Sequence, residues 1–564
     1  MTNAILRGKP DAGNPHVRFD EGEVASAKPR RGSLLYKAQA MKRSASPILA
    51  LVASAALAGG PLSAAVNDVF DVYTVDDLTN ACAKATANFD TIRVHPGAYD
   101  LTGMPMKPAT RAADGSVTAS GTTLAISTYG GRLIGLGERP DDTVIKGGGE
   151  ADSCRLLSFA KICTVSNLTF TGGWVSGASD SGGVEAGGNG TFTDCVFSNN
   201  YARNFGGVFD QPKTVTRCRF VGNRAGSGGV LRPMTASGKD PTLVRDCWLE
   251  GNSAAQNGGI AYYGCTWSNC VFVGNNAKRG GVFGPTYGHA NIATDCRFEG
   301  NAATESGSVA ADDALAAATH CTFVGNATSA GGSGMVGTGA ELVACTLAAN
   351  TGMPLVVAAT LRRCTVRGNV GNRANSNPLF SGCAFYSSLI AENLGGAHSM
   401  SQICSGMGGA LYNCTVVSNA YQAANYSVAD GDVSVNTIFA ANLLVDADGN
   451  ILQRQDLNAK NLPAALTNCL WTATAGTVPG ETAVGGGLVT EAALRFADAA
   501  AGDWSIGRRS VARNAGWSDA AYLEAVGAID LRGLPRVFSG DGAEIDVGAY
   551  ECNVTPMGLL MLLR

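Results

Sequence analysis

The strongest constraint on the fold is a repeated six-residue pattern, Cys-x-Phe-x-x-Asn, which recurs roughly every 20 to 30 residues. Clear copies run from Cys195 to Asn200, Cys218 to Asn223, Cys247 to Asn252 (with Leu249 in place of Phe), Cys270 to Asn275, Cys296 to Asn301 and Cys321 to Asn326. Weaker copies run from Cys345 to Asn350, Cys364 to Asn369 and Cys414 to Asn419. A period of this length is typical of a solenoid in which every repeat forms one structural unit.

The spacing inside the pattern indicates a β-strand followed by a bend. Cys and Phe are two residues apart, so in a strand both side chains point to one face while the residue between them points outward. Asn tolerates left-handed backbone angles and is expected at the bend, where stacked copies would form a hydrogen-bonded ladder. We therefore expect two buried columns. One contains Phe220, Phe272, Phe298 and Phe323, and the other contains Cys218, Cys270, Cys296 and Cys321.

A second strand is indicated by a Gly-Gly pair followed by an apolar residue, as in Gly206-Gly207-Val208-Phe209 and Gly280-Gly281-Val282-Phe283. One repeat cannot bury its own apolar residues, whereas a stack of repeats forms a continuous core. No repeat contains an amphipathic segment of helical length, which excludes an α-solenoid. The predicted fold is all-β, a right-handed parallel β-helix with a short N-terminal helical cap that opens at Val75.

These patterns resemble known families. The Phe-x-x-Asn and Gly-Gly-[Val/Ile] repeats resemble those of polymorphic outer-membrane proteins, and the layout is similar to the pectate-lyase-type β-helix superfamily. Residues 90–99 (DTIRVHPGAY) resemble the first coil of such proteins. The C-terminal segments 510–516, 530–536 and 546–551 resemble the choice-of-anchor Q region of bacterial surface proteins. The resemblance implies the fold and export, but no activity.

The N-terminal segment is typical of an export signal. Lys42 and Arg43 precede an apolar run at 47–60, and the small residues 63–65 form a cleavage site. The expected organisation is an upstream extension that need not be translated (1–40), a signal peptide (41–65), the cap and first coils (66–150), the β-helix repeats (151–470), a choice-of-anchor Q-like region (471–552) and an apolar tail (553–564). We expect a secreted or cell-surface protein whose mature chain has no transmembrane span, because no other apolar run approaches the roughly 20 residues that are needed.

The charge and the cysteine content limit which partners, disulfides and metal sites are expected. The formal charge is −4 with 16% charged residues, which argues against a nucleic-acid partner, since such a protein needs a basic stripe. The 17 cysteines fall mostly once per repeat at the inward position, so we expect small buried hydrophobes, with one or two disulfides at most. No metal site is expected, because no Cys-x-x-Cys pair occurs.

The candidate site is the loop that follows each Gly-Gly strand, because stacking brings equivalent loops to one face. The ligand-binding candidates are Asp210, Arg232, Tyr262, Tyr263 and Tyr287, and the catalytic candidates are Asp312, Asp313 and His289. Aromatic rings provide flat surfaces on which sugars stack, and arginine can bind a carboxylate through two parallel hydrogen bonds. Acidic side chains can be ligands of Ca²⁺. The alternative is that these are ordinary solvated loop residues.

Two functions remain open at this point. The first is a non-catalytic adhesin or carbohydrate-binding β-helix, which is favoured because no catalytic motif is visible. The second is a polysaccharide lyase or glycoside hydrolase acting on uronate-containing polymers, and only this alternative calls for a cofactor, Ca²⁺. The expected partner is a polysaccharide or the surface of a host or neighbouring cell. The fold does not decide between the two functions, because function depends on the site.

Overall fold

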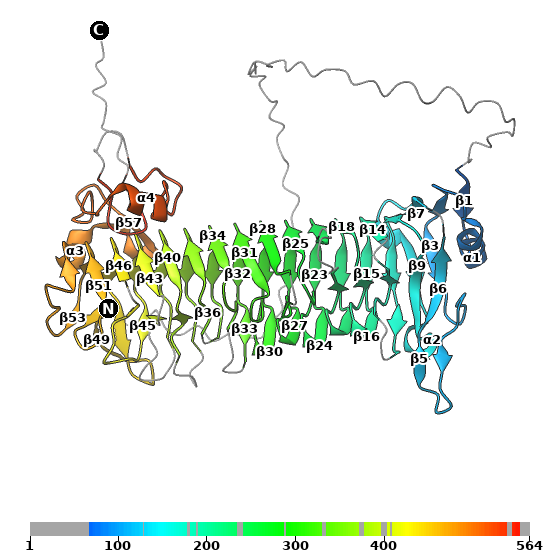
Figure 1. The fold of residues 1–564 in the computed structure, drawn as a ribbon, viewed down its shortest axis with the longest axis horizontal. Helices are drawn as coiled ribbons and strands as arrows, with labels where there is room; N and C mark the ends of the chain where they lie inside the picture. The colour runs from blue at the N-terminus through cyan, green and yellow to red at the C-terminus, as the bar shows by residue number, and fades with distance from the viewer. Residues whose placement is uncertain are drawn as a thin grey trace, which may run out of the picture. The chain divides into compact units, whose positions relative to one another are not determined.

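The computed structural model describes residues 67–552, apart from residues 128, 178–180, 188–189, 234–240, 287–288, 330–333, 353, 372–376, 396–402, 406–408, 432 and 538–543. The described residues belong to one compact unit, in which short strands stack side by side along the chain (Figure 1). Every strand of the main sheets pairs in parallel with the equivalent strand of the next coil. The predicted all-β parallel β-helix is therefore confirmed.

One coil shows the path of the chain. The strand β25 (Thr266–Ser268) lies in the first sheet, β26 (Val271–Val273) in the second and β27 (Asn276–Arg279) in the third. The Gly280-Gly281 bend leads to Phe283, which bridges to the neighbouring coils as part of a short fourth sheet. A loop of variable length then returns the chain to the first sheet.

The strands of the first sheet are β1 (Val69–Val72), β2 (Thr91–Val94), β7 (Gly131–Gly135), β10 (Cys163–Ser166), β14 (Gly190–Thr193), β18 (Thr214–Thr216), β22 (Leu243–Arg245), β25, β28 (Asn291–Thr294), β31 (Leu315–Thr319), β34 (Glu341–Val343), β37 (Thr360–Arg362), β40 (Ala384–Tyr386), β43 (Ala410–Tyr412), β46 (Val433–Val435), β51 (Ala465–Thr467) and β54 (Ala483–Val484). Those of the second sheet are β3 (Gly97–Asp100), β8 (Thr143–Lys146), β11 (Thr169–Thr171), β15 (Val196–Ser198), β19 (Arg219–Val221), β23 (Trp248–Glu250), β26, β29 (Arg297–Glu299), β32 (Thr322–Val324), β35 (Thr346–Ala348), β38 (Thr365–Arg367), β41 (Leu389–Ala391), β44 (Thr415–Val417), β47 (Ile438–Ala440), β52 (Leu470–Trp471) and β55 (Gly487–Leu488).

The third sheet contains β12 (Trp174–Val175), β16 (Tyr201–Phe205), β20 (Arg224–Ser227), β24 (Ser253–Asn257), β27, β30 (Ala302–Ser306) and β33 (Ala327–Thr328). The fourth sheet contains β13 (Glu185–Ala186), β17 (Phe209–Asp210) and β21 (Leu231–Arg232), and it continues through single bridges to β36 (Val356–Val357), β39 (Phe380–Ser381) and β42 (Cys404–Ser405). The α-helices are α1 (Val75–Lys84), α2 (Gly149–Asp152), α3 (Glu491–Leu494) and α4 (Ala520–Val526).

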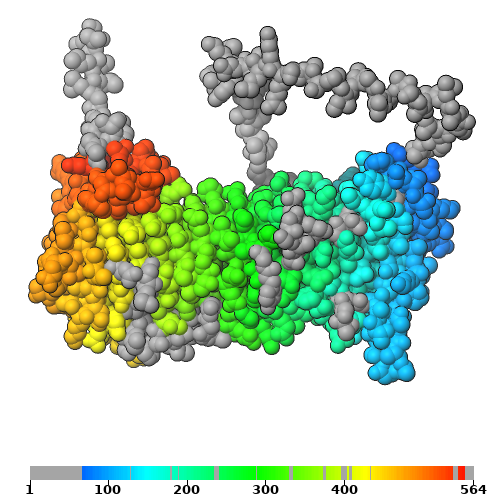
Figure 2. All heavy atoms as spheres, in the orientation of Figure 1, coloured from blue at the N-terminus to red at the C-terminus, as the bar shows by residue number. Residues whose placement is uncertain are grey.

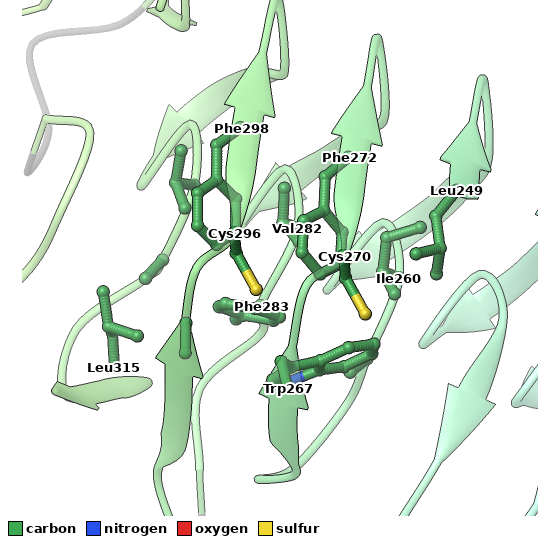
Figure 3. Packing of buried hydrophobic residues seen from close by; sticks show 14 of the residues in the cluster. Leu249, Ile260, Trp267, Cys270, Phe272, Val282, Phe283, Cys296, Phe298 and Leu315 are labelled. Atoms are coloured by element: carbon green, nitrogen blue, oxygen red, sulfur yellow. The ribbon is translucent and has the colours of Figure 1, made fainter. Parts of the chain in front are cut away.

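The predicted phenylalanine column lies in the core. Phe220, Phe272, Phe298 and Phe323 are fully buried, and the strand register places them in one column with Leu249 between the first two. The rings of Phe272 and Phe298 stack with their centroids 4.7 Å apart (Figure 3). Cys218, Cys270, Cys296 and Cys321 form the second buried column, as predicted, and all 17 cysteines are free thiols. Burial raises the pKa of inner thiols such as Cys414, to about 12, which makes them inert small hydrophobes.

The structure corrects two local details. Cys270 does not lie within a strand, because the left-handed Asn269 before it turns the chain from the first sheet to the second. At the next corner the left-handed residue is Gly274 and not Asn275. A non-glycine side chain is costly in that conformation, so Gly is favoured at this corner of the coil, and Asn275 acts through its side chain instead.

That side chain forms the predicted ladder. Each Asn of the ladder except the last donates from Nδ2 to Oδ1 of the Asn one coil further, over 2.9 to 3.1 Å, and the same Oδ1 accepts the backbone N–H of the donor residue. The members are Asn200, Asn223, Asn252, Asn275, Asn301, Asn326, Asn350, Asn369, Asn393, Asn419 and Asn442. The ladder ends on Asp456, whose Oδ1 accepts from Asn442.

The N-terminal end of the stack is covered by α1, as predicted. A capping box between Thr74 and Asp77 starts this helix, and Leu78, Ala81 and Cys82 pack into the core. None of the helices in the described ranges is long and apolar enough to cross a membrane. The predicted upstream extension, signal peptide and apolar tail lie outside the described residues.

The C-terminal region, from α3 onward, packs on the outer face of the stack (orange to red in Figure 2). Trp504, Ile506 and Val547 bury the outward residues of the second sheet, among them Leu389 and Ile438. The segments that resemble the choice-of-anchor Q region contribute several buried residues to this region, among them Arg536 and Glu551, whose side chains pair at 2.5 Å. The assignment of this region to that family stays a prediction.

We predict that Phe272→Ala lowers the free energy of unfolding by about 3–5 kcal/mol, because it removes a fully buried ring from a packed column. Phe272→Leu should cost much less, since Leu249 already occupies an equivalent place. Urea denaturation of the two variants measures the difference. Equal losses would contradict the column packing.

We predict that Asn275→Ala costs roughly 2–5 kcal/mol, because it leaves the N–H and Nδ2 of Asn252 and the carbonyl of Leu249 without their partners. The matched control is Asn276→Ala, since Asn276 is exposed on the next position of the chain. The control should stay within about 0.5 kcal/mol of the wild type. Similar denaturation midpoints for the two variants would show that the ladder is energetically unimportant.

Candidate functional site

The Gly-Gly bend joins the third and fourth sheets over three residues, since β16 ends at Phe205 and β17 begins at Phe209. Gly206 has a φ of 60°, and a Cβ on it would lie 1.9 Å from the carbonyl oxygen of Phe209, so only glycine fits. The outward side chains that precede and follow the bend therefore approach one another. We call Phe205, Asp210, Arg232, Tyr262 and Tyr263 the Gly-Gly face.

The members of the Gly-Gly face contact each other across three coils. Arg232 donates from Nε and Nη2 to the two carboxylate oxygens of Asp210, at 2.7 and 2.6 Å. The guanidinium carbon of Arg232 lies 4.8 Å from the ring centroid of Phe205. Tyr262 stacks on the same Phe205 ring at 5.2 Å with an interplanar angle of 5°, and Tyr263 lies 4.4 Å from Tyr262.

This arrangement differs in one respect from the sequence expectation. The edge of Arg232 that was expected to hold a ligand carboxylate is engaged by Asp210, and the side chain is only 25% exposed. Arg232 thus fixes the orientation of the aromatic rings. Phe205, which precedes the bend, was not among the predicted residues, although its place before Gly206-Gly207 was a usable signal.

The catalytic candidates lie two coils further along. Asp312 pairs with Nη2 of Arg279, and Asp313 accepts a 3.4 Å hydrogen bond from Thr286 Oγ1. His289 is exposed, and no hydrogen bond or ion pair joins it to either aspartate in the described part of the chain. Tyr287 lies outside the described residues. In the ranges that the structure describes, no group of three or more His, Cys, Asp or Glu residues could hold a metal ion.

Glu185, a buried carboxyl beside this face, was not predicted from the sequence. Glu185 is fully buried in the column of the fourth sheet that Phe209 and Leu231 continue, and neither carboxylate oxygen has a hydrogen-bond partner among the described residues. Burial raises its pKa to about 8, opposed by Arg155 and assisted by Asp210. The signal was present, because Gly182-Gly183-Val184-Glu185 has the Gly-Gly pattern with Glu in the place of Phe.

Comparisons with known proteins bear on the fold alone. No protein-family model matches the chain, and no curated protein sequence does. Among solved structures, the A-module of a mannuronan C-5 epimerase from Azotobacter vinelandii covers 74% of this chain and 98% of its own, at 12% identity and a TM-score of 0.28. A mannuronic acid-specific family 6 polysaccharide lyase from human gut microbiota covers 72% of this chain and 87% of its own, at 10% identity and a TM-score of 0.32.

A third similar structure is tailspike protein 3 of bacteriophage CBA120. It covers 72% of this chain and 57% of its own, at 12% identity and a TM-score of 0.26. With identities and TM-scores this low, the three comparisons give no information about the substrate or the chemistry of this chain.

We predict that Glu185 makes the protein less stable as the pH rises. Between pH 4.5 and 8 the folded chain keeps a proton on Glu185 that the unfolded chain has released, so the free energy of unfolding falls across this window and levels off above it. The loss is on the order of several kcal/mol, at 1.36 kcal/mol for each pKa unit. Melting temperatures of Glu185→Gln and wild type should therefore diverge from pH 4.5 to 8, in favour of the variant. Parallel pH profiles would contradict the buried acid.

Proposed function

We propose that the protein is an exported, non-catalytic β-helix that binds a polysaccharide on the Gly-Gly face. The observation that carries this proposal is the aromatic stack of Phe205, Tyr262 and Tyr263, which is held in place by the Arg232–Asp210 pair and is only partly buried. Partly exposed rings whose orientation is already fixed are what binding of a sugar needs, because little side-chain entropy remains to be lost.

The chemistry of the face suits sugars in two ways. The rings offer flat apolar surfaces for the C–H face of a pyranose, and the polar edges of the tyrosines and of Asp210 can exchange hydrogen bonds with hydroxyl groups. Parallel strands carry Phe205, Asp210 and Arg232, and Tyr262 and Tyr263 directly follow the bridge residue Ala261, so their spacing is set by the coil. A ligand in the extended conformation of a polysaccharide can follow consecutive coils.

Export and surface location are part of the same proposal. They rest on the signal-like segment 41–65 and on the choice-of-anchor Q resemblance of the C-terminal region. The partner would then be a polysaccharide on the surface of a host or neighbouring cell, and the protein would act in adhesion.

The lyase alternative has less support among the described residues. Asp312 is neutralised by Arg279, and within the described ranges no hydrogen bond or ion pair joins His289 to either aspartate, so these candidates do not form an assembled acid–base pair. Ca²⁺ would be required only if turnover were found.

The expected result of Phe205→Ala/Tyr262→Ala is a roughly 10- to 100-fold weaker binding of the polysaccharide that the wild type prefers, since two ring contacts are lost. The ligand is first found by screening neutral and acidic polysaccharides against the exported protein. Trp248→Ala is the control, because Trp248 is an exposed aromatic residue of the second sheet, outside this face. Arg232→Lys should weaken binding almost as much as Arg232→Ala, because lysine cannot hold Asp210 with two hydrogen bonds.

Three outcomes would contradict the proposal. Absence of binding to the whole panel would remove the Gly-Gly face as a site, and an equal loss in Trp248→Ala would show that aromatic exposure alone is responsible. Unsaturated products absorbing in the ultraviolet would instead show lyase activity, and then Asp312→Ala and Asp313→Ala should abolish Ca²⁺-dependent turnover.

A further inference from the structure

A second group of aromatic and basic side chains lies on the outer face of the third sheet, and the sequence analysis did not predict it. The parallel register places Trp174, Tyr201 and Arg224 in one outward column on three successive coils. The rings of Trp174 and Tyr201 are 4.2 Å apart, and the guanidinium carbon of Arg224 lies 6.0 Å from the Trp174 ring. We call these three residues and Arg203 the third-sheet strip.

The two arginines of the strip carry uncompensated charge. Arg203 and Arg224 are exposed, and neither forms an ion pair with any residue that the structure describes. The contact recorded for the head group of Arg203 is a 3.3 Å hydrogen bond from Nη1 to the carbonyl oxygen of Ser176. Most other exposed arginines of the β-helix face a carboxylate, as Arg217 faces Asp194 and Arg297 faces Glu299.

On the following coils, the same column contains residues of a different type. The positions after Arg224 are Ser253, Asn276 and Ala302, which offer neither a ring nor a charge. On the neighbouring outward positions of these coils, Lys278 faces Glu305 at 4.0 Å. The combination of stacked rings and unpaired arginines is therefore confined to one stretch of the sheet.

We infer that the third-sheet strip is a binding subsite for an acidic polysaccharide, with Trp174 and Tyr201 stacking on sugar rings and Arg203 and Arg224 holding the anionic groups. Aromatic faces together with a guanidinium match a sugar that bears a carboxylate or sulfate, since arginine binds both groups through paired N–H donors. In a chain with a formal charge of −4, a local excess of positive charge also attracts a polyanion selectively to this surface.

The strip is connected to the Gly-Gly face through a single strand. Tyr201 and Phe205 are the first and last residues of β16, which places them about 13 Å apart at roughly 3.3 Å per residue. An extended polysaccharide that crosses β16 reaches both surfaces. This inference rests on the proposed function, because it specifies that the polysaccharide bound in the same region is negatively charged.

The test uses the mature chain and three linear polymers: dextran, dextran sulfate and polygalacturonate. Dextran is neutral, whereas the other two carry sulfate and carboxylate groups, so the pair shows which anion is recognised. We expect Arg203→Gln/Arg224→Gln to bind at least one of the two polyanions about tenfold more weakly at low salt, and with a flatter salt dependence. Binding of dextran, where the wild type shows it, should not change.

The matched control is Arg245→Gln, because Arg245 is an exposed arginine of the first sheet that forms no ion pair with the part of the chain that the structure describes. The control should bind like the wild type. Trp174→Leu/Tyr201→Leu, checked for an unchanged melting temperature, should weaken polyanion binding at high salt too, where charge contributes little.

The outcomes separate this inference from the proposed function. Wild-type affinity of the arginine variant for both polyanions, or an equal loss in Arg245→Gln, overturns the subsite and leaves the Gly-Gly face untouched. Loss of binding in the strip variants but not in Phe205→Ala/Tyr262→Ala supports the subsite and overturns the Gly-Gly face. A wild type that binds none of the three polymers overturns the subsite.

Discussion

The asparagine ladder is the interaction on which the rest of the structure depends. At the corner between the second and third sheets, a left-handed residue interrupts the strand, and the backbone groups there would be left without partners inside the protein. Each ladder Asn meets this need, because it donates to a carbonyl of the preceding coil and accepts from the neighbouring Asn. The ladder also fixes which residues face each other from coil to coil.

The alignment of residues from coil to coil determines the geometry of every outward surface. Phe205 and Tyr262 can stack only because the coils between them do not slip, and the Arg232–Asp210 pair joins consecutive coils directly. The C-terminal region uses the same scaffold from outside: Asn413 and Asn436, both left-handed corner residues, reach out to bond Asp546 and Trp517. Corners that turn the chain thus also provide attachment points.

Much of the architecture follows from short patterns, whereas the surfaces do not. The inward residues Cys270, Phe272 and Asn275 could be placed because burial imposes a strict periodicity on them. The strand of the first sheet that precedes each Cys was not predicted from the sequence. The residue at the middle of this strand points inward, and its type varies between coils, for example from Trp267 to Ala293. Contacts such as that of Phe205 with Tyr262 join residues two coils apart. No local sequence pattern encodes the direction in which a long side chain extends across a bend.

The directional nature of the ladder has a consequence for how such a chain can change its length. Each Asn presents a donor toward the C-terminus and an acceptor toward the N-terminus, so all internal coils have the same complementary ends. Removing or duplicating one whole coil joins an identical donor to an identical acceptor and keeps the core columns continuous. The sequence can therefore grow or shrink by whole coils. Asp456 ends the ladder, because its carboxylate accepts a hydrogen bond from Asn442 but has no N–H group that could donate to a further coil.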